Sequence, residues 1–324
     1  MGIKNLNKFL LNNTVNAITQ RHISKYAGKV IVIDTSIYMY QFKQEGTLLP
    51  KFASMISLFI TNNVIPIFIF DGKPPEEKSQ MMEKRHQERY EARMEFYKIR
   101  EELENETTDS ESTEETTLSC NEIEMKRELL EELYKKSVRI KREDISEIKK
   151  IMDYNKVQYY DSPIESDPLC SYYVSRGRAF ACLSDDTDMF AYGCPHILRN
   201  LDINTGMLYH YDITRILLEL QMTMQEFREM IIMTGGTDYQ TKCIRSFETL
   251  YYWFKIYKKE TQSLHGNRNT HNRNVKYPFY YWMLHHKTEK TWKTKEEFVV
   301  NNKDFDKIYN LFSVMRTNVP LKIR

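Results

Sequence analysis

Three carboxylates fall close together at the end of a short apolar run, in the segment Phe180-Ala181-Cys182-Leu183-Ser184-Asp185-Asp186-Thr187-Asp188. The apolar run has the length of a strand, and acidic residues after a strand lie at the carboxyl edge of a sheet, where open α/β folds bind ligands. Carboxylates crowded at one edge repel one another or take up protons unless a cation lies between them. A hard divalent metal ion is the usual partner. The segment therefore predicts part of a metal site.

Other segments bring acid towards the same edge. Two near-continuous apolar runs, rich in β-branched residues, end in Asp34 and in Asp71. Such runs are typical of strands buried on both faces of a parallel sheet. Farther on, Glu165 and Asp167 follow a third strand-like run and open a helical pattern, and Asp238 lies on a glycine-rich turn. The pattern predicts an α/β fold with a mostly parallel central sheet flanked by helices, and one acidic site at its edge.

Each of these acids also has a plainer interpretation. A lone Asp after a strand is most often a turn residue or a helix cap, because its short side chain favours both positions. Glu165 and Asp167 alone could simply favour a helix N-terminus. From spacing alone, a shared metal site and a set of independent caps both remain open.

Composition and cysteine usage place the chain among globular intracellular proteins. With 324 residues, of which 41% are hydrophobic, it can bury one large core or two smaller ones. No apolar stretch approaches the ~18 residues of a membrane span. The five cysteines include no Cys-x-x-Cys pair, which argues against a disulfide framework and against a common zinc site. A reducing compartment and no membrane association are expected.

Positive charge is concentrated near the end of the chain. The net charge from Tyr251 to Arg324 is +9, whereas that of the first 250 residues is −7. Aromatic residues alternate with the basic ones, as in the stretches around Trp253 and Trp282. A basic, aromatic-rich region suits a polyanion, and nucleic acid is the natural candidate. The alternative is a solvated basic face over an aromatic core.

A helical pattern over residues 76–100 carries a basic stripe directly after Asp71. At about 100° per residue, most of the glutamates lie on one side of this helix, and five basic side chains fall within an arc of roughly 80° on the other side. The five basic residues are Lys78, Arg85, Arg89, Arg93 and Arg100. Such a stripe can face phosphates at the predicted site. The alternative is an exposed helix stabilised by ion pairs four residues apart.

An acidic segment of low apolar content follows over residues 101–118, and its composition predicts a mobile or disordered stretch. Helical patterns resume over residues 122–134 and 142–154. A helical insertion with a mobile middle is therefore expected between the second and third predicted strands.

Several stretches occur in an order that is specific to one family: Met1-Gly2-Ile3, Ile33-Asp34, Tyr40-Gln41-Phe42, Phe70-Asp71-Gly72-Lys73-Pro74-Pro75, Ser162-Pro163-Ile164-Glu165-Ser166-Asp167, Ser184-Asp185-Asp186-Thr187-Asp188 and Gly236-Thr237-Asp238-Tyr239. They resemble the motifs of the flap endonucleases, structure-specific 5′ nucleases whose family also includes the XPG-type repair nucleases. The resemblance runs from Met1 to about Tyr239. The divergent region after it looks most like the poxviral branch.

The resemblance implies a site for two Mg²⁺ ions, for which Mn²⁺ can substitute, with seven acidic ligands: Asp34, Asp71, Glu165, Asp167, Asp186, Asp188 and Asp238. Asp185 matches a further acid of the family that is not counted as a ligand. Because residues two apart on a regular helix lie about 200° apart, we expect only one of Glu165 and Asp167 to contact metal directly.

The resemblance also implies roles for residues around the metals. Lys78 and Arg85 match the basic catalytic pair on the helix beside the site, and Tyr40 matches the tyrosine that stacks on a base. Gly2 would bring the amino terminus close to the site if Met1 is removed. With the basic stripe, this gives the expected DNA contacts, which are Gly2, Arg89, Arg93 and Arg100.

The implied reaction is hydrolysis of a DNA phosphodiester. Two metal ions roughly 4 Å apart activate water and stabilise the departing 3′ oxygen. Lys78 and Arg85 would neutralise charge on the phosphoryl oxygens. Stacking on Tyr40 would offset part of the cost of fraying the terminal nucleotides. The products would carry a 5′ phosphate and a 3′ hydroxyl.

The expected organisation is a nuclease core over residues 1–240 and a basic DNA-binding extension over residues 241–324. The core includes a helical arch at about residues 76–141, which contains the acidic mobile segment. Expected substrates are 5′ flaps, nicks, gaps or double-strand ends met in replication, repair or recombination. The host cytoplasm would be the site of action for a poxviral member. Residues 240–247 lack the glycines of the family's helix-two-turn-helix, so duplex binding is expected to differ.

Three other functions compete with this interpretation of the sequence. A PIN-type ribonuclease would share the acidic cluster but lack the long basic arch and the match at residues 70–75. A haloacid-type phosphatase would need an acid two residues after Asp34, where Ser36 stands. A noncatalytic DNA-binding or assembly protein would be expected to have lost some of the seven acids, and all seven are present. An enzyme is therefore favoured.

Overall fold

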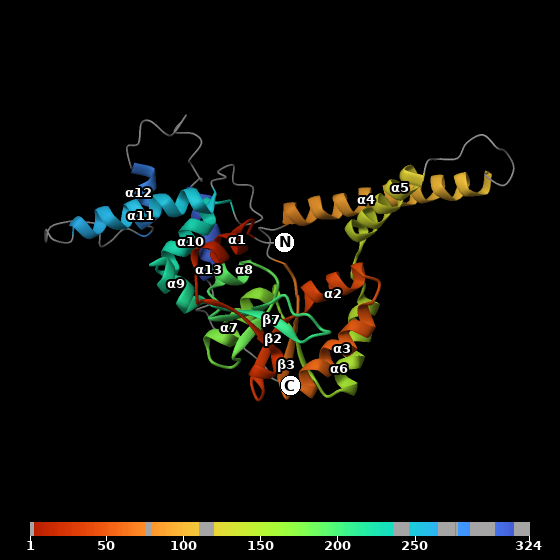
Figure 1. The fold of residues 1–324 in the computed structure, drawn as a ribbon, viewed down its shortest axis with the longest axis horizontal. Helices are drawn as coiled ribbons and strands as arrows, with labels where there is room; N and C mark the ends of the chain where they lie inside the picture. The colour runs from red at the N-terminus through yellow and green to blue at the C-terminus, as the bar shows by residue number, and fades with distance from the viewer. Residues whose placement is uncertain are drawn as a thin grey trace.

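A sheet flanked by helices on both faces organises the computed structural model of the chain (Figure 1). The structure describes residues 3–74, 79–109, 120–235, 246–264, 276, 278–285 and 302–313. In this part of the chain the sheet has seven strands in the order β1-β7-β6-β5-β2-β3-β4. Their bounds are β1 Ile18–His22, β2 Val30–Asp34, β3 Ile65–Phe70, β4 Gln158–Asp161, β5 Ala181–Leu183, β6 His196–Arg199 and β7 Met207–Asp212.

The centre of the sheet is parallel. Strand β2 pairs in parallel with β3 on one side and with β5 on the other, and β4 and β6 continue this arrangement outwards. Asp34 pairs with Ile69, so the carboxyl ends of β2 and β3 lie together. The predicted mostly parallel α/β sheet is confirmed. The antiparallel edge formed by β7 and β1 had no counterpart in the prediction.

Helices connect the strands and cover the sheet. In the first half of the chain they are α1 Leu6–Asn13, the 3₁₀ turn η1 Ile23–Tyr26, α2 Thr35–Gln44, α3 Leu48–Thr61, α4 Ser79–Asp109, α5 Cys120–Ser137 and α6 Arg142–Tyr154. In the second half they are α7 Ser166–Ser175, α8 Asp188–Tyr192, α9 Ile213–Leu220, α10 Met224–Met233, α11 Phe247–Leu264, α12 Pro278–His285 and α13 Asn302–Ser313.

Each face of the sheet has its own hydrophobic core. Because side chains alternate along a strand, Val32 of β2 faces a core built with α1, α7, α8, α10 and the C-terminal helices. Ile31 and Ile33 face the opposite core, built with α2, α3 and α6. Burial on both faces explains why β2 and β3 are continuous apolar runs in the sequence. It also leaves the strand ends as the places where polar side chains can gather.

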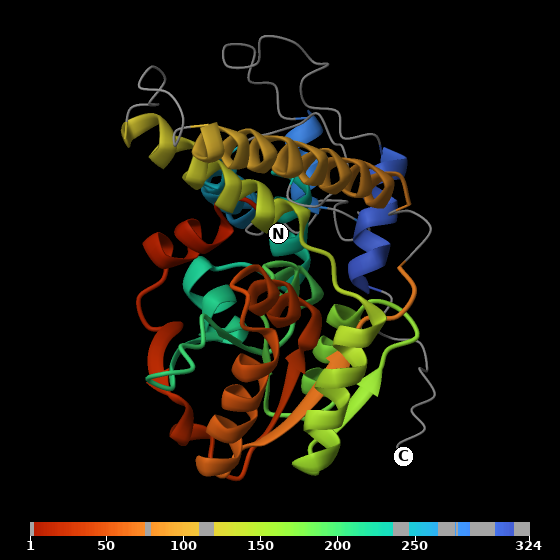
Figure 2. The same ribbon diagram turned by 90° about the vertical axis from the view of Figure 1, so that its right-hand side faces the viewer.

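Helices α4 and α5 form a hairpin that projects from one end of the sheet (Figures 1 and 2). Ala92 and Leu133 are buried between the two helices, and the rings of Phe96 and Tyr134 lie 6.1 Å apart. The helical insertion predicted between the second and third strands is thus present. It begins close to Asp71 and returns to the sheet through α6.

The first part of the acidic segment of residues 101–118 is helical in the structure, and its predicted mobility stays a prediction. Helix α4 continues to Asp109. Glutamates that looked like solvating charge pair with basic residues four positions earlier, Lys98 with Glu102 and Arg100 with Glu104. Such pairs support an exposed helix. Residues 110–119 lie outside the described part of the chain.

Helices α11 to α13 pack into one of the two cores of the sheet. Phe254 and Phe279 are buried, and their ring centroids lie 5.2 Å apart. The edge of one ring packs against the face of the other. Helix α10 holds this region through Glu229, a buried carboxylate that accepts the backbone N–H groups of Phe279 and Tyr280 at 2.9 Å each. For these aromatic residues, the interpretation as an aromatic core is confirmed.

Two further expectations concern the described residues only. None of the described helices is long and apolar enough to cross a membrane. Cys170, Cys182 and Cys194 are buried free thiols.

Candidate active site

The acidic segments lie at the ends of the central strands, where successive strands are added first on one side of β2 and later on its other side. From β2 the chain moves to β3 and β4 on one side, and it later places β5 on the other side of β2. In open α/β sheets a crevice forms at such a point, outside the carboxyl ends of the strands. Asp34 ends β2, Asp71 follows β3, and the acidic turn of residues 184–188 follows β5.

Asp34 is buried and is held by two hydroxyl groups. It occupies the N-cap position of α2, but its side chain makes no cap hydrogen bond. One carboxylate oxygen, Oδ1, lies 3.0 Å from the Ser166 hydroxyl, and Oδ2 accepts a 2.9 Å hydrogen bond from the Ser184 hydroxyl. Asp212, in contrast, caps α9 by accepting the Arg215 N–H. The simple cap interpretation therefore describes Asp212 and not Asp34.

Asp71 is joined to Asp34 through the first residue of α7. Its Oδ1 accepts the backbone N–H of Ser166 at 2.7 Å and lies 2.7 Å from the Ser166 hydroxyl. The hydroxyl carries one proton, so it donates to one of the two carboxylates at a time. Ser166 therefore links the ends of β2 and β3 to the start of α7.

A glycine allows this close approach. The Gly72 N–H donates to the Ile164 carbonyl at 2.8 Å, which ties the end of β3 to the segment before α7. A Cβ at position 72 would lie 1.9 Å from the Ser162 carbonyl oxygen. Any larger residue would push the two segments apart, so the glycine of the Asp71-Gly72 pair has a structural reason.

The acidic turn after β5 is ordered by its own hydroxyls and by the start of the chain. Its hydrogen bonds run from the Asp186 N–H to the Ser184 hydroxyl at 3.1 Å and from the Asp188 N–H to the Asp186 carboxylate at 2.9 Å. The Ile3 N–H donates to the Thr187 hydroxyl at 2.5 Å. Gly2 lies outside the described residues, but its neighbour Ile3 is bound to the acidic turn.

Asp185 points to a different set of partners. Its carboxylate accepts the Asn200 N–H at 2.6 Å, and its carbonyl oxygen accepts the Arg199 Nη2 group at 2.5 Å. Arg199 is 7% exposed, and its guanidinium carbon lies 5.7 Å and 5.8 Å from the ring centroids of Phe190 and Tyr211. Asp185 and Arg199 thus fix the back of the acidic turn.

The carboxylates act on one another electrostatically. Burial raises the pKa of Asp34 to about 7, and the charge of Asp71 adds to this effect, while the hydrogen bonds from the two serines oppose it. Burial also raises the pKa of Asp167 well above its usual range, with further contributions from Asp34, Asp186, Asp71 and Asp188. Five carboxylates from four segments therefore share one local field. A field of this sign favours a bound proton or a cation.

The donor chemistry of this group fits a hard divalent cation. Asp167 Oδ1 is buried and has no hydrogen-bond partner among the described residues. Asp71, by contrast, is exposed, which gives the group access to solvent. Oxygen-only donors suit Mg²⁺ and Mn²⁺. Among the described residues, no three or more His, Cys, Asp or Glu side chains lie together in an arrangement that could hold a metal ion. Asp238, a further predicted ligand that follows α10 in the chain, lies outside the described ranges.

Glu165 and Asp167 take different places at the start of α7. Glu165 is the N-cap residue, and its carbonyl oxygen accepts the Ser162 hydroxyl at 3.1 Å. Its charge is not among the main contributions to the pKa of Asp34 or of Asp167. Asp167 lies in the first turn and inside the acidic group. Which of the two carboxylates would contact metal directly stays a prediction.

The basic helix approaches the site through Tyr40. The Nη1 atom of Arg89, on α4, lies 3.5 Å from the hydroxyl oxygen of Tyr40. Tyr40 lies on α2, which starts directly after Asp34. Arg85 and Arg89 are half-buried, whereas Arg93 and Arg100 are exposed. Arg100 is paired with Glu104 at 2.7 Å. Lys78, like Gly2 and Asp238, lies outside the described residues.

Sequence reasoning missed the residues that hold the acids. Ser166 and Ser184 stand inside the acidic motifs, and a hydroxyl next to a buried carboxylate is a signal that could have found them. Arg199 is the last residue of the short strand β6 and has no motif near it, so nothing in the sequence marks it.

Two family models match the chain. The XPG N-terminal domain matches residues 1–92, and the XPG I-region matches residues 156–238. Together they contain every predicted metal ligand. The unmatched stretch between them, residues 93–155, contains the second half of α4 and the whole of α5 and α6.

Flap endonucleases are among the chain's relatives. Flap endonuclease 1 of Leishmania braziliensis is 27% identical over 264 residues, which cover 75% of this chain and 61% of that protein. Flap endonuclease 1 of Salmo salar is 27% identical over 253 residues, with 72% and 61% covered. The chain thus spans about three fifths of the length of these relatives.

Solved structures share the fold. The catalytic core of Rad2 in complex with a DNA substrate superposes with a TM-score of 0.60 at 16% identity, over 96% of this chain and 86% of that one. GEN1 in complex with product DNA and a Mg²⁺ ion gives a TM-score of 0.55 at 14% identity, over 98% and 66%. At these identities the likeness concerns the fold.

Proposed function

The chain belongs to the XPG-type flap endonuclease family, and we propose that it is a divalent-metal-dependent, structure-specific 5′ nuclease of DNA. Its substrates would be 5′ flaps, nicks, gaps or double-strand ends. The observation that carries the proposal is the group of five carboxylates, from four segments, at the carboxyl edge of β2, β3 and β5. The predicted poxviral branch, which would place the protein in the host cytoplasm, stays a prediction.

The metal would be held by this group. Asp34, Asp71, Asp167, Asp186 and Asp188 supply the oxygen donors, with Asp238 and Glu165 as the remaining members of the predicted set. The buried oxygen of Asp167, which lacks a hydrogen-bond partner within the described residues, and the raised pKa of Asp34 support a cation at this place. Bound Mg²⁺ or Mn²⁺ would supply Lewis-acid stabilisation of the phosphoryl oxygens and lower the pKa of an attacking water.

The protein's own residues would position the acids and the DNA. Ser166 and Ser184 keep the Asp34 carboxylate in one orientation, and the Arg199 contact fixes the turn that carries Asp186 and Asp188. Lys78 and Arg85 would neutralise charge on the phosphoryl oxygens.

Tyr40 and the arch would act on the DNA strand itself. Tyr40, beside the site on α2, would stack on a displaced base. The exposed guanidinium of Arg93 would contact a phosphate of the strand, and Arg89 would do so after leaving its 3.5 Å contact with Tyr40.

The competing functions differ in what they need from the chain. A noncatalytic scaffold has no use for a buried carboxylate with a raised pKa, such as Asp34, because its ionisation opposes folding. A small PIN-type ribonuclease has no use for a long helical hairpin like α4–α5. Both features favour the DNA nuclease.

A cleavage assay with matched substrates tests the proposal. Purified protein is incubated with a 5′-labelled flap duplex and with the same flap strand alone, each in Mg²⁺, in Mn²⁺ and in chelator. We expect cutting near the junction of the flap duplex in either metal and none in chelator. The single strand should be cut far more slowly.

Two results would contradict the proposal in different ways. Equal cutting of both substrates would remove structure specificity and favour a ribonuclease-like activity, which an RNA copy of the strand would then reveal. Binding of the junction without cutting in any metal would favour the noncatalytic scaffold.

A further inference from the structure

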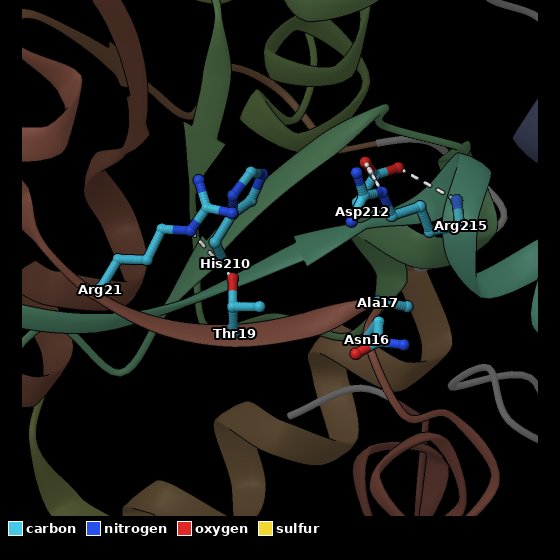
Figure 3. Close-up of a pocket in the computed structure, with 7 residues that line it drawn as sticks. All are labelled: Asn16, Ala17, Thr19, Arg21, His210, Asp212 and Arg215. Atoms are coloured by element: carbon cyan, nitrogen blue, oxygen red, sulfur yellow. Dashed lines mark hydrogen bonds and ion pairs between the residues drawn. The ribbon is translucent and has the colours of Figure 1, made fainter.

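A polar pocket lies on the antiparallel side of the sheet, away from the acidic site. It has a volume of about 210 Å³ and is lined by residues of β1, β7 and α9 and of the segment before β1 (Figure 3): Asn16, Ala17, Thr19, Arg21, His210, Asp212 and Arg215. Strands β7, β6 and β5 separate β1 from β2. At about 4.8 Å per strand, the pocket is about 19 Å from Asp34 across the sheet. It is therefore a separate site.

Two guanidinium groups converge over this pocket. Figure 3 shows Arg21 and Arg215 extending towards each other from opposite sides, with His210 between them. Arg21 is held by the Thr19 hydroxyl, which accepts its Nε–H at 3.0 Å. Arg215 has its Nε 3.6 Å from the Asp212 carboxylate. Like charges that face one another repel, and an anion bound between them would offset this repulsion.

The carboxylate in the pocket does not balance the two guanidinium groups. Asp212 already accepts the backbone N–H of Arg215 as the N-cap of α9. Its single negative charge stands against two positive charges, so the lining keeps an excess of one positive charge.

His210 adds no charge to the pocket. His210 is 6% exposed, and its Nε2 atom lies 3.2 Å from Nδ1 of His196. Burial lowers its pKa to about 4, with further lowering by His196 and Arg21. At neutral pH the ring is therefore an uncharged hydrogen-bonding group beside the two arginines.

We propose that this pocket binds a phosphate group. Guanidinium groups bind phosphate oxygens through paired N–H donors, and the Asn16 amide and the Thr19 hydroxyl offer further polar groups beside them. The cavity has room for such an anion, since one water occupies about 30 Å³ of liquid. Free phosphate and a backbone phosphate of nucleic acid share this chemistry, and the test below distinguishes them.

The test compares two variants of the full chain, each lacking two positive charges. Arg21→Gln with Arg215→Gln removes the pocket's guanidinium groups. Arg142→Gln with Lys150→Gln removes two exposed charges on α6 and serves as the control. The thermal midpoint of each protein in chloride is measured first, to establish that it is folded.

Inorganic phosphate is the first probe, added at constant ionic strength against chloride. Binding to the folded state raises the thermal midpoint. We expect a phosphate-specific rise for the wild type and the control, and at least about a tenfold weaker apparent affinity for the pocket variant.

Duplex DNA in chelator is the second probe, with affinity measured by anisotropy over a range of salt concentrations. A backbone phosphate in the pocket predicts that the slope of log affinity against log salt falls by about 1 to 2 in the pocket variant only. If the pocket variant loses the phosphate-specific rise in thermal midpoint but keeps the salt slope of the wild type, the ligand is a free phosphate. The pocket is not a phosphate site if the wild type shows no phosphate-specific rise and the two variants share one slope. Because no step requires cleavage, these outcomes are independent of the proposed nuclease activity.

Discussion

Hydroxyl groups and a buried guanidinium hold the acidic site together at the level of single residues. Ser166 and Ser184 bind the two oxygens of Asp34, and Arg199 holds the backbone of the neighbouring acidic turn. None of the three is itself an acid. They keep carboxylates in place that would otherwise repel one another in a buried setting. The chemistry of the site therefore depends on residues that are not expected to contact the metal.

Asp34 makes the stability of the metal-free protein depend on pH. Its pKa is raised from 3.8 to about 7 in the folded protein. A carboxyl with a raised pKa stabilises the fold fully below the unfolded value, and this contribution is lost as the pH rises through the folded value. We expect the free energy of unfolding to fall between about pH 4 and pH 7, and to fall less in Asp34→Asn.

Urea unfolding in chelator, at a series of pH values across this range, measures the effect. Mg²⁺ or Mn²⁺ should stabilise the wild type more at the upper end of the range, because protons no longer compete for the carboxylates. Parallel curves for the wild type and Asp34→Asn would show that Asp34 does not titrate in this way.

Arg199 is expected to position the acidic turn. Arg199→Met removes the donor to the Asp185 carbonyl while keeping an apolar side chain between Phe190 and Tyr211. Loss of one partner from a buried hydrogen bond costs about 1–3 kcal/mol of stability. We expect that loss by urea unfolding, together with a lower single-turnover rate at saturating metal under conditions where the variant is folded. A normal rate in the folded variant would remove the positioning role.

At the level of elements, the strand ends were predictable from the sequence because both faces of β2 and β3 are buried. Each continuous apolar run predicts a buried strand, and the acid that follows it, Asp34 or Asp71, is therefore expected at the strand's carboxyl end. The strands β6, β7 and β1 were not predictable in the same way. They are short and mix His, Tyr and Arg with apolar residues, so no clear period marks them. Arg199 and the phosphate pocket lie on these strands, and both were missed.

The junction between β3 and α7 depends on Gly72. In Gly72→Ala the new Cβ would meet the Ser162 carbonyl at 1.9 Å, which is backbone and cannot move alone. We expect a loss of about 1–3 kcal/mol of stability and a fall in cleavage, since Asp71 and Ser166 would separate. Thermal unfolding and the flap assay measure the two effects.

Gly28→Ala is the matched control for this substitution. Gly28 has a φ of +74°, but no atom lies within 4 Å of the position that the new methyl group would take. It should lose about 1 kcal/mol through backbone strain and keep its cleavage rate per folded molecule. Equal loss of cleavage in both variants would show that the approach at Gly72 does not position the site.

For the molecule as a whole, the C-terminal helices belong to the core that carries the sheet. Phe254 and Phe279 pack in the same cluster as Val32 and Cys182. The sequence left open whether its basic, aromatic region is a DNA-binding surface or an aromatic core with a basic face. Long-range packing decides this, and composition does not report it. Tyr252 and Tyr281, exposed by 61% and 45%, are aromatic residues of this region that face solvent.

This shared core predicts a single unfolding transition. Glu229→Ala removes the carboxylate that accepts two backbone N–H groups of α12, and we expect it to lower the stability of the entire protein by about 1–3 kcal/mol. Calorimetry should show the whole transition move. Glu260→Ala, which changes an exposed contact with Trp282, should shift it much less. Two transitions, of which only one responds to Glu229→Ala, would contradict a shared core.

The nuclease proposal requires the carboxylates of this group to hold a metal ion that cleavage needs, and Asp167→Asn is the variant that decides it. Asp161→Asn is the matched control, because Asp161 also lies at the end of a strand but is exposed and paired with Lys149 at 2.6 Å. Flap cleavage and the metal-induced rise in thermal midpoint are measured for both. We expect Asp167→Asn to lose at least about a hundredfold in rate, or about 2.7 kcal/mol, and most of the metal-induced rise, while Asp161→Asn stays close to the wild type. Wild-type cleavage and metal stabilisation in Asp167→Asn would contradict a catalytic metal site at these carboxylates.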